Sequence, residues 1–135
     1  MTDAPQQDNG HRRPHPQPMA APFLEFDLAR ELAELHREPE WKSGHNAKTL
    51  VKYDDFRVVL TALKAHARLP EHRAPGRISV QTVSGHIQVR AQGRTFELPP
   101  GTLLTLDQDI PHDVQALEDS AFLLTIAWPG GRENG

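Results

Sequence analysis

The sequence contains no cysteine. This absence excludes disulfide bonds, thiolate metal sites and a cysteine nucleophile, and it is typical of proteins from a reducing compartment. Long apolar runs are missing as well: no stretch approaches the ~20 apolar residues of a membrane-spanning helix, and the first residues lack the apolar core of a secretory signal. We therefore expect a cytoplasmic protein that is neither exported nor inserted into a membrane.

A strong excess of one charge is also missing, because 15 Lys and Arg residues stand against 18 Asp and Glu residues, for a net charge of −3. No basic stripe interleaved with aromatic residues is present to follow a phosphate backbone. The sequence therefore predicts no nucleic-acid partner. Its length of 135 residues is that of a single domain.

Residues 1–22 are rich in proline and poor in large apolar side chains. Such a segment buries too little apolar surface to offset the entropy of ordering it, so we expect a disordered tail. We expect residues 23–47 to form a helical or extended lead-in and residues 48–130 to form the folded domain.

A short amphipathic helix is predicted over residues 27–38. Asp27 is a favourable N-cap, and Leu28, Leu32 and Leu35 are spaced to share one helix face. Because an apolar stripe this narrow usually packs on its own domain, we expect the helix to cover the folded domain and not a separate partner.

After this helix the apolar period changes to two. Short runs rich in β-branched and aromatic residues are separated by turns of Gly, Pro, Asp and Ser, with no helical pattern between them. This organisation predicts an antiparallel β-sandwich or barrel. The predicted strands are 49–53, 56–63, 77–83, 86–90, 94–98, 102–106, 112–117 and 121–128.

Two spacings of histidine and glycine occur in this strand region: His72 lies upstream of Gly85, and Gly101 lies upstream of His112. They match parts of two signature stretches, G(X)5HXH(X)3,4E(X)6G and G(X)5PXG(X)2H(X)3N. Residues 48–129 therefore resemble the cupin superfamily of small jelly-roll barrels. The resemblance implies an all-β fold, a cupin jelly-roll barrel with a short N-terminal helix and a disordered N-terminal tail.

The resemblance also implies a depleted metal site. In metal-dependent cupins three histidines and a glutamate converge on one ion, but this chain retains only His72 and His112. Ile78 stands at the glutamate position and Ala74 at the second histidine. Since a catalytic metal centre normally has at least three protein ligands, we expect a weak site or none, with a loosely held divalent transition metal as the candidate cofactor.

Three further side chains are candidates to complete such a site, and each has a plainer interpretation. Glu71 would face away from His72 in a regular strand, which favours a solvated carboxylate. His66 stands at the motif's opening glycine, in a turn, where exposure is expected. Asp107 also lies in a turn, where aspartate commonly accepts hydrogen bonds from nearby backbone amides.

A small-ligand pocket at the barrel mouth is the other implication of the resemblance. Apolar walls with a few convergent polar groups are the usual form of such a pocket. The residues expected to line it are Arg68, His72, Ile78, Val80, Leu104, His112 and Phe122.

Two classes of function follow, and the sequence leaves both open. The first is a binding or sensing module, or a metal-free catalyst in which His72 or His112 moves a proton. The second is a metal-dependent oxygenase, isomerase or lyase that uses both histidines with Glu71, His66 or Asp107. A small molecule is the expected partner, and the dimers that cupins often form through edge strands allow a homodimer.

Overall fold

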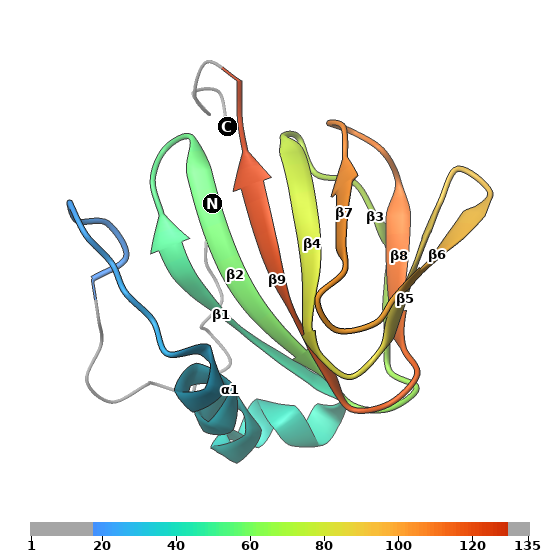
Figure 1. The fold of residues 1–135 in the computed structure, drawn as a ribbon, viewed down its shortest axis with the longest axis horizontal. Helices are drawn as coiled ribbons and strands as arrows, with labels where there is room; N and C mark the ends of the chain where they lie inside the picture. The colour runs from blue at the N-terminus through green and yellow to red at the C-terminus, as the bar shows by residue number, and fades with distance from the viewer. Residues whose placement is uncertain (1–17, 130–135) are drawn as a thin grey trace.

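The computed structural model describes residues 18–129. This part of the chain contains one α-helix, one short 3-10 helix and nine strands, which confirms the predicted all-β fold (Figure 1). The elements are α1 (Leu28–Arg37), η2 (Pro39–Ser43), β1 (His45–Lys52), β2 (Phe56–Leu63), β3 (Arg68–His72), β4 (Arg77–Ser84), β5 (Ile87–Ala91), β6 (Arg94–Leu98), β7 (Leu103–Leu106), β8 (His112–Ala116) and β9 (Ser120–Ala127).

The strands form two sheets that face each other. One has the order β1-β2-β9-β4-β7 and the other the order β3-β8-β5-β6. Every neighbouring pair is antiparallel. We call the end of the barrel where β3 ends and β8 begins the upper rim, since it lies at the top of Figure 1. This arrangement confirms the predicted jelly-roll barrel.

The core lies between the two sheets, where the predicted twofold alternation holds. On β4, Ile78, Val80 and Thr82 point inward and are almost fully buried, whereas Gln81 is exposed. The buried apolar residues of the core are Leu63, Ile78, Val80, Ile87, Val89, Leu98, Val114, Ala116 and Phe122.

Strand β3 is the element that the alternation did not predict. It lies at the edge of its sheet, and its pairing with β8 shifts register between Leu69 and His72. Between these two residues β3 contains one more residue than the facing segment of β8, which is a β-bulge. Pro70 lies within the bulge, where its missing N–H is tolerated because the strand is at an edge.

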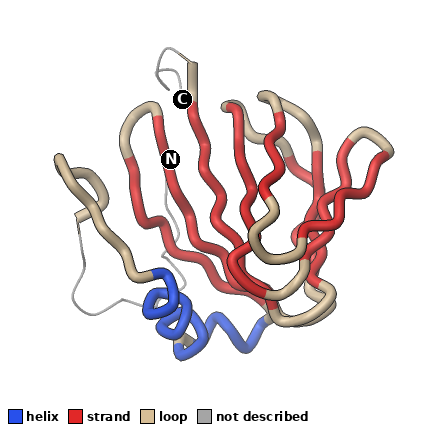
Figure 2. The backbone as a smooth tube through the Cα atoms, viewed as in Figure 1, coloured by secondary structure: helices blue, strands red, loops and turns tan. Residues whose placement is uncertain are grey.

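Helix α1 begins where it was predicted, after Asp27, whose side chain accepts a hydrogen bond from the Arg30 backbone N at 3.3 Å. It packs on the outer face of β1 and β2 at their lower end (Figure 2). Leu35 is fully buried there, and Asn46 Nδ2 donates to its carbonyl oxygen at 3.0 Å. The helix therefore packs on its own domain, as predicted.

The residues just before this helix also contact the barrel. The Lys52 backbone N donates to the Met19 carbonyl at 2.7 Å, and Tyr53 Oη donates to the Ala21 carbonyl at 2.6 Å. The last residues of the expected tail thus bond to the end of β1, while residues 1–17 lie outside the described residues. No helix within residues 18–129 has the length and apolar character to cross a membrane.

Candidate functional site

His72 and His112 are direct partners across β3 and β8 at the upper rim. Their ring centroids lie 4.5 Å apart, with the ring planes inclined by 55°. His112 is 4 % exposed and alternates with the core residues Val114 and Ala116, so the pair lies on the inner face of the sheet. His72, at the end of the edge strand, remains exposed to solvent.

Both rings are oriented by backbone carbonyls. His72 Nδ1 lies 3.2 Å from the Pro70 oxygen, and His112 Nδ1 lies 2.9 Å from the Ile110 oxygen. Because a carbonyl oxygen only accepts, each Nδ1 must carry the hydrogen, and a neutral ring then keeps its lone pair on Nε2. The pair therefore presents two Nε2 acceptors side by side on the inner face of β3 and β8.

The protonation of His112 is set by its surroundings. Burial lowers the pKa of His112 below the ordinary imidazole value, and repulsion from His72 lowers it further. The pKa is raised by the Ile110 carbonyl, Asp113 and Glu71, but together these do not cancel the effect of burial. At neutral pH the His112 ring is therefore an uncharged acceptor.

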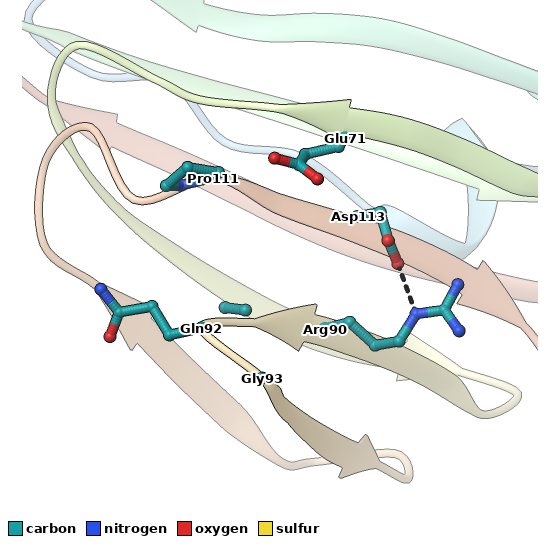
Figure 3. Close-up of a pocket in the computed structure, with 7 residues that line it drawn as sticks. Glu71, Arg90, Gln92, Gly93, Pro111 and Asp113 are labelled. Carbon is teal, nitrogen blue, oxygen red and sulfur yellow. Dashed lines mark hydrogen bonds and ion pairs between the residues drawn. The ribbon is translucent and has the colours of Figure 1, made fainter.

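The bulge in β3 decides which side chain joins His112. In a regular strand Leu69 and Glu71 would share the inner face and His72 would point outward. The extra residue reverses this relation, so His72 joins Leu69 on the inner side. Glu71 lies on the outer face of the sheet, near Asp113 (Figure 3).

An open groove of about 320 Å³ lies on that outer face, and we call it the outer groove. Asp113 borders it and is only 8 % exposed; its Oδ1 accepts from Arg90 Nε at 3.0 Å and its Oδ2 from an Arg68 terminal nitrogen at 3.0 Å. Burial alone would raise the pKa of Asp113, but the two guanidinium groups lower it. The lining residues are Glu71, Arg90, Ala91, Gln92, Gly93, Pro111 and Asp113 (Figure 3).

The substitute ligands considered from the sequence do not join the histidine pair. His66 is exposed, and its backbone N donates to the carbonyl of Ala116, at the opposite end of β8 from His112. Asp107 accepts from the Gln108 backbone N at 2.8 Å and from Arg77 Nε at 2.9 Å, which confirms its turn role. Glu71 lies on the outer face. The chain between residues 18 and 129 holds no group of three or more metal-binding side chains.

This donor set does not fit the metal centre of metal-dependent cupins. Two imidazoles leave a divalent ion coordinated mainly by water, whereas a catalytic zinc or iron ion is normally held by three or more protein ligands. The pair is thus equipped for hydrogen bonding through its two Nε2 atoms.

Apart from the histidine pair, the side chains expected to line a pocket are divided among three environments. Ile78, Val80 and Phe122 lie in the packed core, each 4 % exposed or less. Leu104 is partly buried against that core, whereas Arg68 lies on the outer face, where it binds Asp113. Other partly buried apolar side chains packed against the core include Leu69, Leu106, Leu124 and Ile126.

Sequence reasoning missed the residues of the outer groove other than Glu71. Asp113 follows His112 directly, and alternation along β8 places consecutive side chains on opposite faces, so this residue could have been found. Gln92 precedes Gly93 in a turn signal between two predicted strands. Nothing in the sequence pattern pairs Asp113 with Arg68 and Arg90, because that contact depends on the order of three strands in the sheet.

Comparison with known proteins finds a protein family whose model matches this chain. The family model described as the AraC-like ligand binding domain matches residues 55–131. Among solved structures, a conserved protein of unknown function from Streptococcus pyogenes is 24% identical, covers 64% of this chain and 76% of its own, and has a TM-score of 0.61. A comparison with curated proteins finds no match.

Two more solved structures share the fold at lower identity. A cupin superfamily protein from Desulfitobacterium hafniense is 13% identical over 62% of this chain and 77% of its own, with a TM-score of 0.61. A salicylate 1,2-dioxygenase variant from Pseudoaminobacter salicylatoxidans is 18% identical over 74% of this chain but 32% of its own, with a TM-score of 0.65. At such identities the likeness shows the fold and not the chemistry.

Proposed function

Because the chain belongs to the family of AraC-like ligand-binding domains and folds as a small cupin barrel, we propose that it binds a small molecule at the upper rim, beside His72 and His112. The histidine pair carries the proposal. Its two rings lie 4.5 Å apart on the inner face, and each Nδ1 is already bound to a backbone carbonyl.

This arrangement favours a ligand that donates hydrogen bonds. An uncharged imidazole whose Nδ1 carries the hydrogen keeps an Nε2 lone pair, which can accept from a hydroxyl or an N–H of the ligand. Since the carbonyls of Pro70 and Ile110 hold the rings in place, little side-chain entropy remains to be lost when the ligand binds.

The surroundings favour a ligand with an apolar body. Leu69 on β3, Leu104 and Leu106 on β7, and Leu124 and Ile126 on β9 are apolar and only partly buried against the core. Apolar walls with a few polar groups are typical of sites for small molecules. A small alcohol or phenol combines the apolar body with a single donor and is therefore the ligand class that we favour.

The same pair would also serve a metal-free reaction. A base works best when it is uncharged at the working pH, and the lowered pKa of His112 keeps its Nε2 free to accept a proton at pH 7. A metal-dependent enzyme is the weaker alternative, because no third ligand lies beside the pair within residues 18–129.

The test uses benzyl alcohol and its hydrocarbon counterpart toluene as probes, with the histidine ring nitrogens followed by nuclear magnetic resonance. We expect benzyl alcohol to shift the Nε2 signals of His72 and His112 in a saturable way, and toluene to leave them unchanged. His72→Ala and His112→Ala should each weaken binding at least tenfold, whereas the exposed strand residue His45 serves as the control, His45→Ala. Saturable shifts that map away from the pair, or binding by both single variants as tight as that of the parent, would contradict the proposal.

A further inference from the structure

We propose that the ligand of the upper rim carries a carboxylate in addition to its hydroxyl group, and that Arg94 binds this carboxylate. The inference rests on the proposed function, because it assigns a second group of the same ligand. It starts from one row of side chains across the four-stranded sheet. In that row Arg94 is the register partner of Ala91, Ala91 that of His112, and His112 that of His72.

The side chain of Arg94 lies on the inner face of this sheet. Because His112 faces inward, its register partner Ala91 and then Arg94 share that face. An independent contact agrees with the register: Arg94 Cζ lies 4.7 Å from the centroid of the Phe96 ring, and Phe96 packs against the core between the sheets. Since β6 is an edge strand and Arg94 is its residue nearest the upper rim, the guanidinium group remains exposed to solvent (Figure 1).

The N–H donors of Arg94 are available to a ligand. The guanidinium group forms no hydrogen bond or ion pair with any residue between positions 18 and 129. A guanidinium group over an aromatic ring keeps its N–H donors, which lie in its own plane, for a second partner. A carboxylate can accept two parallel hydrogen bonds from such a group, which makes it the anion of choice.

The charges on the inner faces at the upper rim also favour an anion. The inner row at this end of the five-stranded sheet is Arg57, Ile126, Ile78 and Leu106. Arg57 faces inward because the next residue, Val58, packs with helix α1 on the outer face. Arg94 and Arg57 are thus the charged side chains of the two rows, apart from the histidines, and neither row contains a carboxylate.

The spacing within the row sets the length of the ligand. Ala91 carries only a methyl group, so no longer side chain stands between Arg94 and His112 in this row. Adjacent strands lie about 4.8 Å apart, so these two residues are separated by roughly 9.6 Å at the backbone. A benzene ring with a hydroxymethyl group and a carboxylate at opposite positions spans most of this distance. The next inner row provides apolar contacts for the ring: Phe96, Val89, Val114 and Leu69.

The test compares 4-(hydroxymethyl)benzoate with the uncharged 4-(hydroxymethyl)benzamide, which has nearly the same shape. Both are titrated into the full chain while the histidine ring nitrogens are followed. We expect the benzoate to bind roughly fivefold more tightly than the benzamide, which is what a partly exposed charge pair contributes. Added salt should reduce this preference, because it screens the pair.

Arg94→Gln should abolish the preference for the benzoate, and Arg94→Lys should retain part of it. Arg37, an exposed arginine at the end of α1, provides the matched control Arg37→Gln, which should keep the full preference. Equal affinity of the parent for the two probes would overturn the inference, as would an undiminished preference in Arg94→Gln.

Benzyl alcohol separates this inference from the proposed function. Its affinity should be the same in the parent and in Arg94→Gln, which also shows that the variant folds and keeps the histidine pair in place. If benzyl alcohol binds but the benzoate has no advantage, only the role of Arg94 fails. If benzyl alcohol does not bind while the benzoate still binds through Arg94, only the proposed function fails.

Discussion

His72 and His112 face each other across β3 and β8 with ring centroids 4.5 Å apart, and each Nδ1 is bound to the carbonyl of the residue two positions earlier in the chain. Each ring is thus oriented by a backbone carbonyl. Because both Nδ1 atoms are occupied in this way, only the two Nε2 atoms remain to bind a metal ion, which leads to the first prediction.

Protein purified without a histidine tag should contain much less than one metal ion per chain. Two imidazoles bind late divalent metals such as nickel and zinc only weakly, and only where the rings are neutral. A chelator should therefore leave the melting temperature almost unchanged. Replacing both His72 and His112 by alanine should remove the residual nickel or zinc binding measured by calorimetry while the chain still folds. One tightly held ion per chain would show that a third ligand completes the site.

Stability should fall as the pH drops below about 6.5. Burial lowers the pKa of His112 in the folded state, so below the ordinary imidazole pKa the unfolded chain binds a proton that the folded chain does not. The contribution of His112 to the free energy of unfolding is therefore fully present above its pKa in the unfolded chain, and it is lost as the pH falls through its pKa in the folded chain. Denaturant unfolding at about pH 7.5 and 5.5 measures the loss. The loss should be smaller in His112→Gln; an equal loss would assign the pH dependence to other groups.

Removing the charge of Asp113 should destabilise the four-stranded sheet. Asp113→Asn weakens the hydrogen bonds to Arg68 and Arg90 and leaves two guanidinium groups without their shared carboxylate. Because both arginines remain partly exposed, we expect a cost of about 1–2 kcal/mol and a fall of several degrees in the melting temperature. The exposed Glu97, which binds His86 and Gln88 on the same face, is the matched control: Glu97→Gln should hardly change the melting temperature.

Gln92→Asn should raise stability. Asparagine followed by glycine is the preferred pair for this two-residue turn, so relief of the strain at φ 51° should contribute roughly 0.5–1 kcal/mol. A fall in melting temperature for Gln92→Asn would show that the parent turn is unstrained.

Two glycines at the motif turns should respond differently to alanine. Gly85 and Gly101 have φ values of 79° and 86°, which an alanine adopts at a cost of about 1 kcal/mol. At Gly85 a Cβ would also collide with Ser120 Oγ and the Asp119 carbonyl, whereas at Gly101 it meets open space. We therefore expect Gly85→Ala to lower stability by at least 2 kcal/mol and Gly101→Ala by roughly half as much. Equal losses in thermal unfolding would contradict this.

The fold was predictable because most strands follow a simple rule. Along β4 and β5 the buried residues alternate with exposed or half-buried ones, and a period of two can be read without knowing which strands pair. Spacing also identified the one motif histidine that each hairpin retains. Their approach to 4.5 Å follows from the strand order of the jelly roll, which the resemblance supplied.

The rest of the site depends on features that a local pattern does not contain. Strand β3 was missed because Pro70 and the bulge interrupt its alternation. The pocket residues assigned from the resemblance were divided between the core and the outer face, because fold similarity does not indicate how tightly the side chains of this chain fill the barrel. The ion pairs of Asp113 join residues 45 and 23 positions apart in the sequence.

The bulge between Leu69 and His72 makes the chemistry of the inner wall sensitive to chain length. If β3 paired regularly with β8 and kept all its residues, Glu71 would lie two positions after Leu69 and would face His112; deleting Pro70 would also remove the bulge, but it would keep His72 in that place. The extra residue therefore decides whether a carboxylate or an imidazole stands beside His112, since Glu71 and His72 are adjacent. In this fold, a one-residue change of register in an edge strand, with no substitution at either residue, is enough to exchange one functional group for another at the barrel mouth.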